Sequence, residues 1–203
     1  MKSVVVGSGG REHALAHVLG RDSDVTVTPG NPGIPNSTTQ SPLNIDADLF
    51  VIGPEAPLVD GLADQLRAQG KTVFGPGVDG AQLEGSKAWM KDLLVEANVP
   101  TAKHGTFTNE DEAIAFLSDM PLPYVIKTDG LAAGKGVIVT ESVNEAKDAI
   151  KNYLSGDAFG DAGKTVVIEE GLIGNEISIL AICDGTKAVP LAPAQDYNCL
   201  LYT

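Results

Sequence analysis

The feature of the sequence that most constrains the fold is a glycine-rich segment between two short apolar runs, YVIKTDGLAAGKGVIV at residues 124–139. The runs at 124–126 and 137–139 are rich in β-branched residues, which favour strands. Glycine allows backbone N–H groups to face an anion and leaves room for its close approach. The segment therefore predicts two antiparallel strands joined by a flap that closes over a phosphate group. The glycines of this loop are Gly130, Gly134 and Gly136.

Two lysines add positive charge to this segment, Lys127 at the end of the first strand and Lys135 in the loop. The spacing G-x-x-x-G-K-G differs from the Walker A pattern G-x-x-x-x-G-K-[ST], and the loop leads into a strand rather than a helix. A triphosphate is the ligand that this arrangement favours. A glycine-rich hairpin with a surface lysine explains the same residues, and this segment alone leaves both interpretations open.

The composition limits the location and partners of the chain. Its 203 residues suffice for one large domain or two small ones. A net charge of −13 argues against bulk attraction to nucleic acid or to an anionic membrane. Cys183 and Cys199 form no CxxC pair, and we find neither a signal-peptide pattern nor an apolar run near the ~20 residues that cross a bilayer. We therefore expect a cytoplasmic protein.

The N-terminal residues form a second anion-binding pattern. An apolar run at 3–6 leads into a glycine-rich turn at 7–13, and a helical pattern follows. Such a turn directs free N–H groups and the positive end of the helix dipole at a ligand. Glu12 replaces the last glycine of the dinucleotide fingerprint G-x-G-x-x-G, so a phosphate on a smaller ligand fits better, with Arg11 beside it. A plain strand–helix turn is the alternative.

The residues up to 85 predict a doubly wound unit with a parallel sheet. Segment 34–48 contains no convincing helix. The loops at 29–33 and 53–57 follow apolar runs, and ligands of open α/β sheets bind at the carboxyl ends of strands. The further strands are expected at 25–28, 49–52 and 72–74, with a helix at 59–69.

A helix is predicted from an N-cap at Ser86 through Ala97. Lys87 and Lys91 lie in or near its first turn, where a cation opposes the helix dipole and costs about 0.3–1 kcal/mol. Lys87 is therefore the candidate for a ligand role, whereas we interpret Lys91 as a tolerated surface lysine. The side chains expected on the buried side are Trp89, Met90, Leu93, Leu94 and Ala97.

From residue 100 onward the pattern changes to paired strands with helices between them, which indicates an α+β layer. Capping-box patterns begin helices at Asn109 and Ser142, and Asp184-Gly185 predicts a hairpin turn. The expected strands are 124–128, 136–140, 165–170, 176–183 and 187–192. We accordingly expect two domains, at residues 1–85 and 86–203.

Several motifs taken together resemble successive segments of the phosphoribosylamine–glycine ligases, also called glycinamide ribonucleotide synthetases, of the ATP-grasp superfamily. The motifs are VVVGSGGREHALA, PGNPG, VIGPEAPLVDGL, QLEGSKAWMKDLL, VIKTDGLAAGKGVIV and VIEEGLIGNEIS, and the resemblance extends from residue 1 to about residue 196. It implies a Rossmann-like N-terminal domain followed by the first part of an ATP-grasp domain. It also implies phosphoryl transfer from ATP to glycine, followed by attack of the phosphoribosylamine nitrogen on glycyl phosphate.

The resemblance also implies roles for particular residues. Lys127 and Lys135 are the catalytic candidates, because this chemistry depends on positioning and on neutralising the transferred phosphoryl group. The implied ATP-binding residues are Lys87, Lys127, Lys135, Gly130, Gly134, Gly136, Glu169, Glu170, Leu172 and Glu176. The implied substrate-binding residues are Gly9, Gly10, Arg11, Glu12, Gly53, Pro54, Glu55 and Asp196.

The cofactors implied are ATP and Mg²⁺ (or Mn²⁺). The substrates implied are glycine and 5-phosphoribosylamine, and we expect the protein to be a monomer. Segment 34–48 is shorter than the strand-and-helix insert of the resembled family, and the residues after 196 depart from its pattern. The metal ligands of that family are expected beyond residue 203, so no metal ligand is assigned and an inactive fragment is expected. The alternatives are a nucleotide- or sugar-phosphate-binding module without turnover and another ATP-grasp carboxylate–amine ligase.

Overall fold

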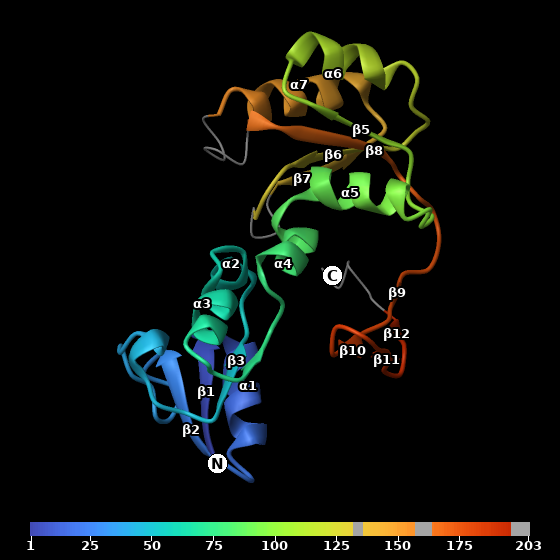
Figure 1. Ribbon diagram of the computed structural model, residues 1–203. Coiled ribbons are helices and arrows are strands. Elements are labelled where there is room, and N and C mark those ends of the chain that lie inside the picture. The colour runs from blue at the N-terminus through green and yellow to red at the C-terminus, as the bar shows by residue number, and fades with distance from the viewer. Residues whose placement is uncertain (132–135, 157–163, 196–203) are drawn as a thin grey trace, which may run out of the picture.

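The computed structural model describes residues 1–131, 136–156 and 164–195. The chain forms two sheet-based units, which are joined by helices α4 (Val78–Gly85) and α5 (Lys87–Glu96). Figure 1 shows the N-terminal unit around β1, β2 and β3 and the second unit around β5 to β8.

The sheet of the N-terminal unit has four strands in the order β2-β1-β3-β4, all parallel. Alternate residues of strand β1 point to opposite faces of the sheet. Val5 therefore packs toward α1, whereas Val4 and Val6 pack toward α2 and α3. This arrangement confirms the doubly wound parallel unit. The elements are β1 (Lys2–Gly7), α1 (Gly10–Leu19), β2 (Asp24–Pro29), β3 (Leu49–Ile52), α2 (Glu55–Val59), α3 (Leu62–Ala68) and β4 (Val73–Phe74).

Two connections in this unit differ in character. The helix expected at 59–69 is confirmed in α3, but it starts later than predicted, because the chain turns at Gly61, whose φ of +82° lies in the left-handed region. Helices α2 and α3 therefore flank this glycine. Between β2 and β3 the structure contains only the 3₁₀ helix η1 (Pro42–Asn44) and a bridge from Ser37 to Val27, as expected for a segment without a helical pattern.

The second unit contains a four-stranded sheet in the order β5-β8-β6-β7, with antiparallel neighbours. Helices α6 and α7 cover one face, and α5 lies on the opposite side in Figure 1. Asn109 and Ser142 cap α6 and α7 as predicted, since each side chain accepts a backbone N–H three residues later. The elements are β5 (His104–Phe107), α6 (Glu110–Leu117), β6 (Tyr124–Thr128), β7 (Val137–Thr140), α7 (Val143–Leu154) and β8 (Val166–Glu170).

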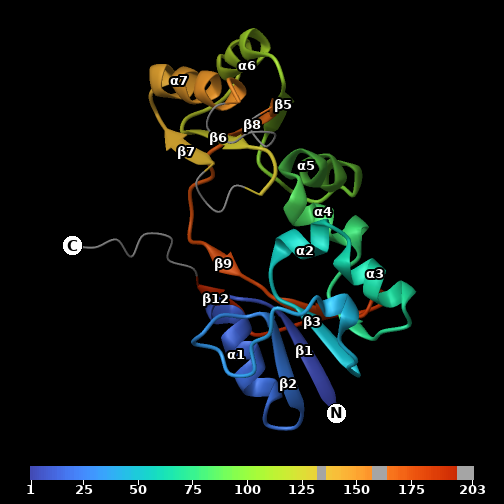
Figure 2. The same ribbon diagram turned by 90° about the vertical axis from the view of Figure 1, so that its left-hand side faces the viewer.

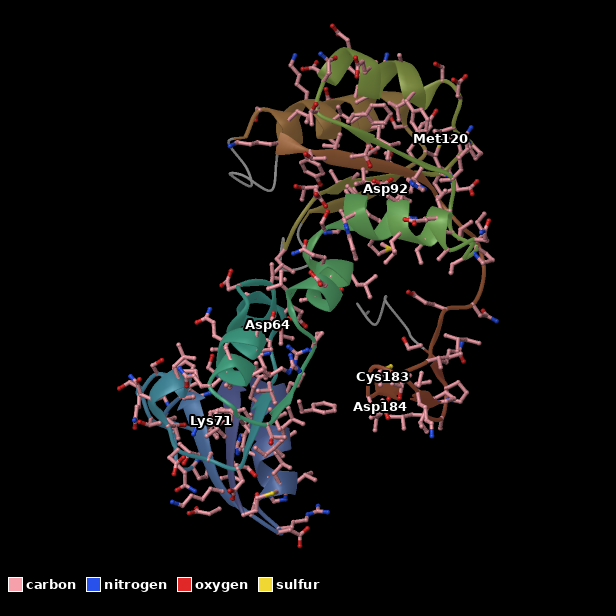
Figure 3. The ribbon with its side chains drawn as sticks, in the orientation of Figure 1. Asp64, Lys71, Asp92, Met120, Cys183 and Asp184 are labelled. Carbon is pink, nitrogen blue, oxygen red and sulfur yellow. The ribbon has the colours of Figure 1, made fainter. Side chains whose placement is uncertain are left out.

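The residues after β8 form two small antiparallel pairs, β9 (Ile177–Ser178) with β12 (Ala194–Gln195) and β10 (Ala181–Cys183) with β11 (Ala188–Pro190). The hairpin at Asp184-Gly185 is confirmed, and Figure 3 shows Cys183 and Asp184 at its turn. The single strand expected at 176–183 is wrong, because it divides into β9 and β10. Strands β5 and β12 were not predicted. Figure 2 shows β9 leading away from the four-stranded sheet.

Candidate functional site

The period of the strands places two charged side chains on the sheet face opposite α6 and α7. In β6, Tyr124 and Ile126 belong to the core beneath these helices, so Lys127 faces the other side. In β8, Ile168 belongs to the same core, and Glu169 therefore faces the other side as well. Lys127 pairs with Val167 and Val125 with Glu169 across the two strands, so the charged residues are diagonal neighbours.

Glu169 is the centre of a buried ion triad. Its Oε1 lies 2.8 Å from Lys127 Nζ, and its Oε2 lies 2.9 Å from Lys91 Nζ. Burial would raise the pKa of Glu169, but hydrogen bonds and charge from Lys127 and Lys91 together hold the pKa of this carboxyl below its usual range. The triad therefore carries two positive charges and one negative charge.

Lys91 was misinterpreted from the sequence, because it is the buried residue of α5 rather than a surface lysine. Its ammonium also donates a hydrogen bond to Thr101 Oγ1 at 2.8 Å. The expected buried side of α5 is partly wrong, since Trp89 is 40% exposed and Ala97 is exposed, whereas Met90, Leu93 and Leu94 are half-buried. The local helical pattern did not mark this lysine as buried, because its partner Glu169 lies in a strand far along the sequence.

A cavity of about 560 Å³ lies over the exposed side of the triad. Lys127, 26% exposed at its side chain, reaches its wall, and the chain after β8 forms much of the remainder. The structure thus brings together five of the residues predicted to bind ATP. The lining residues are Ala102, Val125, Lys127, Glu169, Glu170, Leu172, Ile173, Gly174, Asn175 and Glu176.

The N-terminus of α5 is fastened to the first residues of the glycine-rich loop. Asp129 Oδ1 accepts the backbone N–H groups of Lys87 at 2.6 Å and Ala88 at 3.2 Å, and its Oδ2 accepts the Ser86 hydroxyl at 3.1 Å. Lys87 Nζ donates to the Gly130 carbonyl at 2.7 Å. The Asp129 carboxylate therefore offsets the unfavourable position of Lys87 at the helix dipole. Sequence reasoning missed Asp129, because it lies 42 residues from Lys87.

The described part of the glycine-rich loop has the geometry that its glycines predicted. Strands β6 and β7 are antiparallel, and the Thr128 N–H donates to the Gly136 carbonyl at 2.8 Å. Gly130 has a φ of +79°, which favours glycine. Lys135 and Gly134 lie outside the described residues, and so does Asp196.

Three loops meet at the carboxyl ends of β1, β2 and β3 in the N-terminal unit, as predicted. The Gly30 N–H donates to the Gly7 carbonyl, and the Asn31 amide donates to the Ser8 carbonyl at 2.6 Å. The loop after β2 lines a second cavity of about 580 Å³. This hollow is formed by Pro29, Gly30, Asn31, Pro32, Ser37, Thr38 and Thr39.

Glu12 is buried beneath two of these loops. Its Oε2 accepts the Gly9 N–H at 2.7 Å, and its side chain fills the space next to Gly7 and Gly53. A Cβ at Gly53 would overlap the Glu12 carboxylate. The acid that replaces the last glycine of the dinucleotide fingerprint therefore supports the loop from inside and occupies part of the helix N-terminus.

Arg11 forms an ion pair with Glu55, the first residue of α2. Its Nη1 lies 2.9 Å from Glu55 Oε1, and its Nε lies 3.1 Å from Glu12 Oε1. The hydrogen bond from Arg11 lowers the pKa of Glu55, and the same bond raises the pKa of Arg11. The predicted residues Gly9 to Glu12 and Gly53 to Glu55 are thus adjacent, with Pro54 as the N-cap of α2.

The described residues lack two kinds of feature. They contain no group of three His, Cys, Asp or Glu residues arranged to hold a metal ion. Within the same residues, none of the helices has the length and apolar character needed to cross a membrane.

The second unit, with its antiparallel sheet and a cavity whose wall includes Lys127, has the fold of part of an ATP-grasp domain. An ATP-grasp protein of Sphaerobacter thermophilus described as a RimK domain protein superposes with a TM-score of 0.66 at 17% identity, covering 90% of this chain and 69% of that one. Family models for the N domain and the ATP-grasp (A) domain of phosphoribosylglycinamide synthetase match residues 1–84 and 85–202. The chain belongs to the phosphoribosylglycinamide synthetase family.

Individual relatives agree with this assignment. Phosphoribosylamine–glycine ligases of Xanthomonas campestris and Xylella fastidiosa are 46% and 48% identical over 98% of this chain, which covers 50% and 49% of those proteins. The crystal structure of phosphoribosylamine–glycine ligase from Thermotoga maritima superposes with a TM-score of 0.79 at 30% identity, covering 95% of this chain and 49% of that one. The chain therefore spans about half the length of the curated relatives that it matches.

Proposed function

We propose that this chain provides the sugar-phosphate unit and the first part of the ATP site of a phosphoribosylamine–glycine ligase. The reaction would transfer the terminal phosphoryl group of ATP to the glycine carboxylate. The nitrogen of 5-phosphoribosylamine would then attack glycyl phosphate and release phosphate, giving glycinamide ribonucleotide. The observation that carries the proposal is the cavity beside the Lys91–Glu169–Lys127 triad, because Lys127 reaches the cavity wall, where its ammonium can make a charge-assisted contact with a phosphate.

Within this cavity, Lys127 would contact the phosphates, and Lys87 would join it by exchanging the Gly130 carbonyl for a phosphate oxygen. The glycine-rich loop, with Gly130, Gly134, Lys135 and Gly136, would cover the same phosphates. Lys127 and Lys135 would neutralise charge on the transferred group, which accelerates the reaction without a protein nucleophile. Residues Glu169, Glu170 and Leu172 would border the adenine, and Glu176 would accept from the ribose hydroxyls.

The loops of the N-terminal unit would hold phosphoribosylamine. Gly10 and Arg11 lie at the start of α1, where backbone N–H groups and the dipole attract a phosphate. Arg11 would exchange part of its pairing with Glu55 for the ligand. Glu12 would shape the site from below, since it is only 4% exposed. Gly9, Gly53, Pro54 and Glu55 would border the same ligand, and Asp196 is proposed as a further substrate contact. In this proposal, residues 1–85 form the domain that binds phosphoribosylamine, and residues 86–203 form the domain that binds ATP.

The reaction also implies Mg²⁺ (or Mn²⁺), which would supply positive charge to the nucleotide phosphates. The described residues offer no cluster of carboxylates that fits this ion, so we assign it no ligand here. We also propose that the 203-residue polypeptide, which spans about half the length of the relatives that it matches, binds ligands without completing the ligation. A binding module without turnover is the second candidate for this reason.

Titration calorimetry with ATP tests the proposal directly. Lys135→Ala should weaken binding by about 1.5–3 kcal/mol, because a charge-assisted contact is lost. Lys147→Ala on the exposed face of α7 is the matched control and should bind like the parent. Equal affinities of the parent and Lys135→Ala would contradict the phosphate role of the loop. Glycine-dependent ADP release by the purified 203-residue chain at about 1 s⁻¹ or faster would show that it is a complete catalyst.

A further inference from the structure

We infer that Lys91 is a positioning residue, which keeps Glu169 compensated so that Lys127 can turn from Glu169 to a phosphate of the bound nucleotide. The identity of the anion rests on the proposed function. The role of Lys91 in charge compensation rests on the triad alone.

The two lysines hold opposite oxygens of one carboxylate and differ in exposure. Lys91 reaches Oε2 from α5, and its side chain is 5% exposed. Lys127 reaches Oε1 from β6, and its side chain is 26% exposed and lines the cavity. Only Lys127 is thus in a position to contact a ligand, whereas Lys91 acts through Glu169.

The charges explain why the second lysine matters. If Lys127 were the only partner of Glu169, a phosphate would have to compete with the carboxylate for it. Removing Lys127 would then leave a buried carboxylate unpaired, which is strongly unfavourable. Because Lys91 remains on Oε2, Glu169 stays ionised and paired when Lys127 moves. The ligand therefore gains a cation without exposing a buried unpaired charge.

Lys91 is also held independently of the ligand. Its ammonium donates to Thr101 Oγ1 at 2.8 Å, so two groups fix it beneath the sheet. Methionine is the appropriate replacement, because it retains most of the apolar stem and removes the charge.

The first test needs no ligand. Thermal unfolding is compared for the parent, Lys91→Met, Lys127→Met and the double variant at pH 7. Each single variant leaves Glu169 one cation, so we expect the loss of Tm in the double variant to exceed the sum of the single losses. This excess should shrink as the pH falls, because protonation neutralises the uncompensated carboxyl. Additive losses at every pH would overturn the inference.

A rescue variant covers the possibility that Lys91→Met folds poorly. Adding Glu169→Gln removes the charge that Lys91 compensates, so the Tm of Lys91→Met with Glu169→Gln should exceed that of Lys91→Met alone. A lower Tm in the combined variant would overturn the charge-compensation role, because it would assign Lys91 a packing role instead.

The second test measures ATP binding by calorimetry in two buffers of different ionisation enthalpy. Lys91→Met should bind about tenfold or more weakly, and should take up a proton at Glu169 as ATP binds, whereas the parent takes up none there. Lys147→Met should match the parent in affinity and proton uptake. Parent-like affinity and proton uptake in Lys91→Met would overturn the inference. If the parent and Lys147→Met both fail to bind ATP, the proposed function falls, and the ligand-free comparison still decides the role of Lys91.

Discussion

The attachment of α5 through Asp129 gives the sharpest stability prediction. Asp129 accepts two backbone N–H groups and one hydroxyl at the start of α5. A hydrogen bond to a charged group contributes about 1.5–3 kcal/mol, and a carboxylate at a helix N-terminus adds about 0.3–1 kcal/mol. These contributions overlap, so we expect Asp129→Ala to lower the free energy of unfolding by about 2–4 kcal/mol. Asp129→Asn keeps an acceptor oxygen and should lose about half as much.

Trp89 makes the measurement specific to this helix. It is the single tryptophan of the sequence, lies in the first turn of α5, and donates its backbone N–H to Ser86 Oγ at 3.1 Å. Urea unfolding followed by tryptophan fluorescence therefore reports the attachment directly. Asp148→Ala, on the exposed face of α7, is the control and should change stability by less than about 0.5 kcal/mol. An Asp129→Ala effect no larger than that of Asp148→Ala would refute the reasoning.

Three further predictions concern the loops and the triad. Gly53→Ala should lower the Tm, because the new Cβ overlaps Glu12. At Gly10, apart from the chain neighbours and the backbone of its own helix, no described heavy atom lies within 4 Å of an added Cβ, so Gly10→Ala should not destabilise the chain. Equal effects of the two substitutions would contradict the packing of Glu12. Ribose 5-phosphate should raise the Tm of the parent and much less that of Arg11→Met, and equal shifts would exclude Arg11 from the phosphate site. Because the pKa of Glu169 is lowered on folding, its pairing stabilises the chain above the ordinary carboxyl pKa of about 4.3 and is lost as the pH falls through the lower folded-state value. Glu169→Gln should flatten the stability profile in that acid range, and an unchanged profile would contradict the pairing.

Much of the fold follows from local patterns in the sequence. The apolar run of β1, the caps at Asn109 and Ser142 and the turn at Asp184-Gly185 are each specified by neighbouring residues, and each was predicted. The break between α2 and α3 was missed, because a glycine within a helical pattern is tolerated in other helices. Here its left-handed conformation ends one helix and begins the next.

The candidate site was only partly predictable, because its key contacts join residues that are distant in the sequence. Lys127 and Glu169 belong to recognisable strands, and the strand period places both on one face. Lys91 and Asp129 gave no such signal. The propensity of an isolated helix assigns Lys91 to solvent, whereas the buried carboxylate of Glu169 draws it inward. The buried position of Lys91 therefore follows from its ion pair with Glu169 and not from the local helix pattern.

The contacts of Asp129 and Lys91 anchor α5 at two points beside the candidate site. Its N-terminus is held by Asp129 at the start of the glycine-rich loop, and its middle is held by Lys91 beneath the cavity. Lys87 adds a third contact, to the carbonyl of Gly130 in the same loop. A phosphate that attracts Lys87 and Lys127 would compete with the protein oxygens that now bind these two lysines, the Gly130 carbonyl and the Glu169 carboxylate. Asp129 and Lys91 do not have to move in that exchange. The helix therefore stays anchored while the two lysines of the site transfer to the ligand.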